Sequence, residues 1–143
     1  MGLSGAQVTS IEASEAIYES TKSRLGSFKN VALVHSTFQN YLNNELPKLN
    51  PTFDLIFIDG HHHGPALLRY VELLLPHLSR AGLLVCDDVH WSPDMESAWA
   101  TIRQDEAWTM TLDVFEMGVA TRRPGLTRMD VNVVLRGHPK PVL

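Results

Sequence analysis

The chain has 143 residues, of which 44% are hydrophobic and 20% charged, and its formal net charge is −4. This length and composition predict one globular domain over 1–143. The order of the elements described below places its core at about 5–123 and a tail at 124–143. The negative charge argues against a protein that wraps duplex nucleic acid with a basic stripe. No apolar run approaches the roughly 18 residues of a membrane span, and the N-terminus lacks a secretory pattern. We therefore expect a cytoplasmic protein with no nucleic-acid or membrane partner.

The N-terminal third predicts two strands, each followed by a helix. The strands are short apolar runs, and a Ser or Thr stands at the N-cap position of each helix. The expected order is a strand over 7–11, a helix over 14–25, a strand over 30–35 and a helix over 37–46. Glu12 then lies at the end of the first strand, and Ser36 and Thr37 lie at the end of the second.

The stretch over 53–89 predicts a strand, a helix and a second strand. The strands, 53–58 and 82–86, are nearly continuous apolar runs, which is typical of parallel strands buried on both faces. The apolar positions between them recur at helical spacing as far as Leu78, and Pro76 is expected to end or kink this helix. Because such a crossover is right-handed, both strands end at the same edge, where open α/β sheets bind ligands. The single cysteine, Cys86, is expected to be buried and to form no disulfide.

Beyond residue 90 the pattern predicts one more helix and a hairpin. Ser92-Pro93 begins the helix, which turns Met95, Ala98, Trp99 and Ile102 toward the sheet. An alternating strand over 108–115 and a second strand over 118–122 suit an antiparallel hairpin. A last strand-like run covers 131–135. The fold class is therefore α/β, with a mostly parallel sheet that ends in an antiparallel C-terminal hairpin.

Three carboxylates follow the two central strands. Asp59 ends the first, and Asp87 and Asp88 end the second, so we expect them to converge at one sheet edge. Oxygen ligands of this kind suit Mg²⁺ or another hard divalent cation, which could bind substrate hydroxyls and lower their pKa. The alternative is that Asp59 orients a cofactor or loop, while the other two cap the following turn.

The run His61-His62-His63 follows the first of these carboxylates. A zinc site is not expected, because adjacent side chains point in different directions and the i, i+4 pair of helical zinc sites is absent. We predict that His62 acts as general base or lines the cofactor pocket, since a near-neutral pKa suits that task. His90 is the second candidate base. The alternative for at least one histidine of the run is an exposed polar loop.

Three segments carry a resemblance to a known family. They are FDLIFIDGHHH, LLPHLSRAGLLVCDDV and TLDVFEMGVATRR. Over about 5–123 the chain resembles the class I S-adenosylmethionine-dependent methyltransferases, and these segments look like that family's fourth strand, its fifth strand with the preceding helix, and its sixth and seventh strands. The DG-x-H and DD pairs look like the branch of small-molecule O-methyltransferases that use a divalent metal.

The resemblance implies a Rossmann-like sheet with helices on both faces and a cofactor site at the strand ends. Glu12 would accept hydrogen bonds from the ribose hydroxyls, as acidic residues do in dinucleotide-binding folds. Ser36 and Thr37 would lie near the adenine, and Asp59 and His61 would belong to the same cofactor site. For Thr37 the alternative is that it only caps the helix that follows it. The implied reaction moves a methyl group from S-adenosylmethionine to an oxygen of a small molecule.

One feature of the family is not found in the sequence. No G-x-G-x-x-G or G-x-G-x-G occurs, and the family's first strand, which is central in its order 3-2-1-4-5-7-6, would precede residue 1. We therefore expect an incomplete sheet, whose unpaired edges favour homo-oligomers or aggregates and whose affinity for S-adenosylmethionine is weak. The run over 131–135 is a candidate to fill the gap.

Two other functions remain open on the sequence alone. A catalytically silent remnant could serve as a binding or interaction domain, because its glycine-rich cofactor loop is missing. A nicotinamide-dependent oxidoreductase is disfavoured by the hairpin and by the missing glycine fingerprint.

Overall fold

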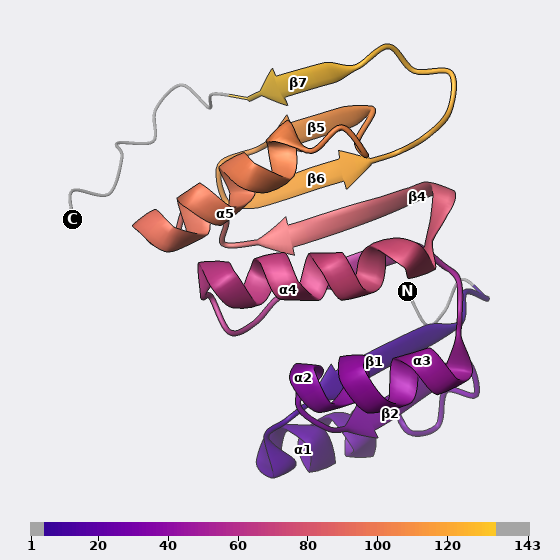
Figure 1. Ribbon diagram of the computed structural model, residues 1–143. Helices are drawn as coiled ribbons and strands as arrows, with labels where there is room; N and C mark the ends of the chain where they lie inside the picture. Colours follow the sequence, from indigo (N-terminus) through magenta and orange to yellow (C-terminus); the bar gives the residue numbers. More distant parts are fainter. Residues whose placement is uncertain (1–4, 134–143) are drawn as a thin grey trace. The chain divides into compact units, whose positions relative to one another are not determined.

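The computed structural model describes residues 5–133, which fall into two compact units divided between Asn50 and Pro51. Each unit has a sheet of its own, with two strands in the first and five in the second (Figure 1). Every helix in the described part of the chain falls short of the length and hydrophobicity that a membrane span requires.

The first unit begins with two parallel strands. Its first three elements are β1 (Val8–Glu12), α1 (Glu15–Leu25) and β2 (Val31–His35). In the register of the pair, Glu12 lies opposite His35, so both strands end at the same edge. Ser14 occupies the N-cap position of α1 as predicted, but its side chain makes no capping hydrogen bond. None of the residues of α1 is buried.

The second half of this unit is a helical segment in three parts. They are α2 (Phe38–Asn40), a π-helical turn (Tyr41–Glu45) and α3 (Leu46–Leu49). The prediction that the helix ends before Pro47 is wrong, because this proline lies in the first turn of α3, where its missing N–H is not needed. Asn50 then ends the helix in the left-handed conformation. The buried side chains of Tyr41, Leu42 and Leu46 form the apolar core of the unit.

The second unit is a five-stranded sheet with two main helices. Its elements are β3 (Phe53–Ile58), α4 (Gly64–Leu74), a 3₁₀ turn (Leu75–His77), β4 (Leu78–Asp87), α5 (Pro93–Gln104), β5 (Met110–Asp113), β6 (Met117–Thr121) and β7 (Met129–Asn132). The strand order is β3-β4-β6-β5-β7. β3 and β4 are parallel, β6 is antiparallel to both of its neighbours, and β7 is parallel to β5. The predicted α/β sheet with an antiparallel hairpin is confirmed.

Two strands differ most from their predicted bounds. β4 begins at Leu78 rather than at Gly82, because Leu78 pairs with Phe53 and is buried in the sheet after Pro76 has ended the helix. The last strand covers Met129–Asn132 and pairs with β5, at the opposite end of the sheet from β3. It therefore does not fill the position beside β3 that the sequence left open. Residues 134 and 135 of that prediction lie outside the described residues.

The core of this unit lies between one face of the sheet and the helices α4 and α5. Gly118 of β6 touches the ring of Trp99, since a Cβ at Gly118 would come within 2.5 Å of it. At the start of α4, a Cβ at Gly64 would come still closer to the backbone carbonyl group of Asp94 in α5. The side chains that fill this core include Ile56, Ile58, Leu67, Val71, Leu84, Met95, Ala98, Trp99 and Ile102. The predicted inward face of α5 is confirmed.

The other face of the same sheet is not buried to the same degree. In β3, Ile56 and Ile58 are 8% and 6% exposed, whereas Leu55 and Phe57 are 37% and 52% exposed. The prediction of strands buried on both faces is therefore not met by β3. Cys86, which belongs to the covered face of β4, is fully buried as predicted, and burial raises the pKa of its thiol to about 12.

Candidate functional site

The strands β3 and β4 bring two loops to one edge of the sheet. Ile58 lies beside Cys86 in the parallel register, so Asp59 and Asp87 follow at neighbouring positions. The β3–α4 loop (residues 59–63) and the β4–α5 loop (residues 88–92) both leave from this edge. The convergence of the two strand ends that the sequence predicted is thus present in the second unit.

The backbone of these loops adopts conformations that side chains disfavour. His61, His62 and Asp88 have φ angles of 68°, 21° and 53°. Only a few per cent of residues other than glycine have positive φ, and such residues cluster at functional sites, where the surrounding structure holds them. Three of them on two adjacent loops mark this edge as the candidate site.

The two loops meet at His62. Its Nδ1 lies 3.3 Å from Oδ2 of Asp88, and its ring centroid is 5.8 Å from that of Trp91. An Nδ1–H that donates to the Asp88 carboxylate leaves the lone pair of Nε2 to accept a proton. A carboxylate that fixes the tautomer of a histidine in this way is the arrangement of a general base with its orienting group. Trp91 is 64% exposed.

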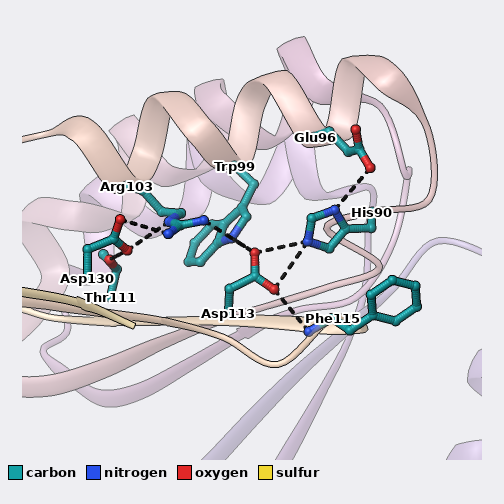
Figure 2. A network of polar contacts seen from close by, with 8 residues as sticks. All are labelled: His90, Glu96, Trp99, Arg103, Thr111, Asp113, Phe115 and Asp130. Atoms are coloured by element: carbon teal, nitrogen blue, oxygen red, sulfur yellow. Dashed lines mark hydrogen bonds and ion pairs between the residues drawn. The ribbon is translucent and has the colours of Figure 1, made fainter. Parts of the chain in front are cut away.

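His61 and His90 lie close to this pair but have other partners. His61 Nδ1 is 2.8 Å from the Tyr70 hydroxyl, which ties its ring to α4. His90 places Nδ1 3.1 Å from Glu96 and Nε2 2.9 Å from Asp113 (Figure 2). Burial alone would lower the pKa of His90, but the hydrogen bonds and charges of Asp113 and Glu96 raise it above its ordinary value. With both ring nitrogens facing carboxylates, the geometry suits a holding role, and His90 as a base stays a prediction.

The three carboxylates share the sheet edge without forming a cluster of metal ligands. Within residues 5–133, no group of three or more His, Cys, Asp or Glu side chains is arranged to hold a metal ion. Asp88 instead faces His62. The two strand ends therefore come together, but within the described residues Asp59, Asp87 and Asp88 are not arranged as ligands of one metal ion.

The predicted cofactor residues of the first unit gather at one end of β1 and β2. Glu12 Oε1 accepts a hydrogen bond from the Ser14 N–H at 2.7 Å, and the Ser36 N–H donates to the Glu12 carbonyl at 3.0 Å. Thr37 Oγ1 caps α2 by accepting from the Asn40 N–H at 3.1 Å. The structure thus brings Glu12, Ser36 and Thr37 together, and their role toward a cofactor stays a prediction.

Sequence reasoning missed the residues that surround His90. Asp113 of β5 is buried, and Glu96 and Arg103 of α5 belong to the same group of polar contacts (Figure 2). The only signal in the sequence is the alternation over 108–115, which puts Thr111 and Asp113 on one face. That alternation does not say which face is covered, and a polar face is usually solvated.

Comparisons with known proteins agree with this architecture. A family model described as a methyltransferase domain matches residues 2–89, more than half of the chain. Among solved structures, an O-methyltransferase from Bacillus cereus in complex with SAH has a TM-score of 0.65 at 18% identity, covering 82% of this chain and 64% of that one. An SAH-bound methyltransferase from Podospora anserina has a TM-score of 0.63 at 20% identity, covering 81% and 60%.

These matches extend over less than two thirds of both solved chains. No curated protein sequence matches this one. In the described residues, the order β2-β1 of the first unit matches the 3-2 part of the family order 3-2-1-4-5-7-6. The order β3-β4-β6-β5 of the second unit matches its 4-5-7-6 part, with β7 added at the edge. The chain belongs to the methyltransferase-domain family, and its fold is that of the class I S-adenosylmethionine-dependent O-methyltransferases.

Proposed function

We propose that the protein transfers a methyl group from S-adenosylmethionine to an oxygen of a small molecule. The observation that carries this proposal is the pair His62 and Asp88 at the strand-end edge of a methyltransferase fold. The substrate oxygen forms a bond to the methyl carbon as the bond from that carbon to the sulfonium sulfur breaks. His62 Nε2 accepts the proton that the substrate hydroxyl loses, and Asp88 stabilises the resulting imidazolium.

The residues at the strand ends fit the polar parts of the cofactor. When bound, S-adenosylmethionine supplies the activated methyl group. Glu12 would accept hydrogen bonds from the ribose hydroxyls, and Ser36 and Thr37 would border the adenine. The cofactor role of Asp59 and His61 stays a prediction of the sequence. The main contribution of the protein is to hold the substrate oxygen in line with the methyl carbon, because positioning supplies a large part of the rate of such displacements.

Formation of S-adenosylhomocysteine (SAH) tests the reaction class. We expect the protein, mixed with S-adenosylmethionine and a panel of small hydroxylated compounds, to release SAH above the blank for at least one compound. The same compounds with the hydroxyl replaced by hydrogen should give none. The alternative, a silent binding domain, predicts SAH at blank level with every compound even when S-adenosylmethionine binds.

A divalent cation stays a prediction of the sequence, and no step above depends on one. If Asp59, Asp87 and Asp88 do hold an ion, calorimetry should detect Mn²⁺ binding that is weaker in Asp87→Asn, since removing a charged ligand weakens a hard-cation site. Asp54→Asn, near the start of the strand that Asp59 follows, is the matched control. Equal binding of Mn²⁺ to the wild type and Asp87→Asn, or no binding to either, would reject the hypothesis of a metal site. The cytoplasmic location and the homo-oligomer also stay predictions.

A further inference from the structure

Asp113 gathers hydrogen-bond donors from three parts of the second unit. Its Oδ2 accepts from the Trp99 indole N–H at 3.0 Å and lies 2.9 Å from His90 Nε2, while Oδ1 accepts from the Phe115 N–H at 2.9 Å (Figure 2). Arg103 Nη1 lies 3.5 Å from the same carboxylate. Asp113 is only 6% exposed. Burying a carboxylate costs free energy unless hydrogen bonds and opposite charges compensate for it. The contacts of Asp113 are therefore expected to keep its side chain in place.

The group of polar contacts around Asp113 continues on the far side of Arg103. The Arg103 guanidinium makes a two-pronged contact with Asp130 of β7, with Nε at 2.8 Å and Nη2 at 2.7 Å. Thr111 donates to Asp130 at 2.6 Å. Asp130 therefore shares the polar group with Asp113 but has no contact with His90 among the described residues.

On its other side, Asp113 contacts the β4–α5 loop through His90. His90 stands in the middle of this loop, between Asp88 and Ser92, which is the N-cap of α5. Its ring is held from both sides, by Asp113 and by Glu96, and it stacks on Phe115 at 5.5 Å between centroids. Fixing His90 fixes the two neighbours that contact His62, because Asp88 and Trp91 are joined by a turn in which the Trp91 N–H donates to the Asp88 carbonyl at 2.9 Å.

We propose that Asp113 is a positioning residue for the candidate site. It holds His90, His90 holds the β4–α5 loop, and the loop sets Asp88 and Trp91 against His62. Asp113 itself touches neither substrate nor cofactor. This inference rests on the proposed function, because positioning matters for turnover only if His62 takes the substrate proton.

The test compares Asp113→Asn with Asp130→Asn in the full chain. Both variants remove one carboxylate charge from the same polar group, but only Asp113 contacts His90. We expect Asp113→Asn to lower kcat at least about tenfold with KM within about twofold, since small displacements of reacting groups have effects of this size. In the NMR spectrum of Asp113→Asn, the resonances of the His62 ring and the Trp91 indole should be shifted from those of the wild type. Asp130→Asn should match the wild type in kcat and in both resonances.

A second variant tests the same link in case Asp113→Asn does not fold. His90→Gln breaks the same link at a partly exposed side chain, and we expect the same loss of kcat and the same shifts. The double variant should be no worse than either single variant, because the two residues act in series. Wild-type His62 and Trp91 resonances in His90→Gln or Asp113→Asn, or equal losses in Asp113→Asn and Asp130→Asn, would overturn the proposal. The resonances report on the loop without turnover, so a failure of the proposed function remains distinguishable.

Discussion

His62→Gln is expected to lower kcat by about 10²–10⁴-fold, the usual contribution of a general base, while the affinity for S-adenosylmethionine changes little. The reason is that glutamine keeps a polar side chain of similar reach but cannot accept a proton near neutral pH. Turnover measured as SAH formation and affinity measured by calorimetry separate the two effects.

The neighbouring His63 provides the matched control for this experiment. It is exposed and occupies the N-cap position of α4 without a side-chain capping bond, so His63→Gln should turn over like the wild type. Full activity in His62→Gln would remove His62 from the catalytic residues, and the same assay would then be applied to His90.

Trp99→Ala should lower the free energy of unfolding by about 3–5 kcal/mol, the range measured for large aromatic side chains removed from a core. Trp99 is 1% exposed, packs on Gly118 and donates its indole N–H to Asp113. Trp99→Phe restores most of the volume but removes the donor, so we expect an intermediate loss of about 1–3 kcal/mol.

Trp91→Ala is the control for this stability measurement. Both residues are tryptophans, but Trp91 is exposed, and surface substitutions usually change stability by less than about 0.5 kcal/mol. Denaturant unfolding of the three variants ranks these effects. Equal losses in Trp99→Ala and Trp91→Ala would show that the core is not centred on Trp99.

The elements whose bounds were predicted best are those that turn or capping residues delimit in the sequence. β3 was predicted with the correct bounds, because its apolar run stops at Asp59-Gly60. α5 begins at Pro93 behind a Ser92 cap, as predicted. The errors at Pro47 and Leu78 have the opposite cause. A proline can lie inside a first helical turn, and a leucine at helical spacing can equally start a strand, so local pattern does not decide either case.

The candidate site was only partly predictable for a related reason. The strand ends at Asp59 and Asp87 follow from the right-handed crossover, which is a rule of topology. The contacts of Asp113 instead join residues that are far apart in the sequence. Trp99 is 14 residues away from it and His90 is 23 residues away. Such contacts are fixed by packing of α5 on the sheet. No spacing rule in the sequence connects these three residues.

Calorimetric titration of S-adenosylmethionine into the wild type and Glu12→Gln tests the central claim most directly. A ribose-binding carboxylate makes charge-assisted hydrogen bonds of about 1.5–3 kcal/mol each, so its loss should weaken binding by about tenfold or more. We expect S-adenosylmethionine and SAH to bind at one site, both to be weakened in Glu12→Gln, and NAD not to bind. Glu15→Gln, at the start of α1, should bind like the wild type. Binding of NAD in place of S-adenosylmethionine, or unchanged affinity in Glu12→Gln, would contradict the account.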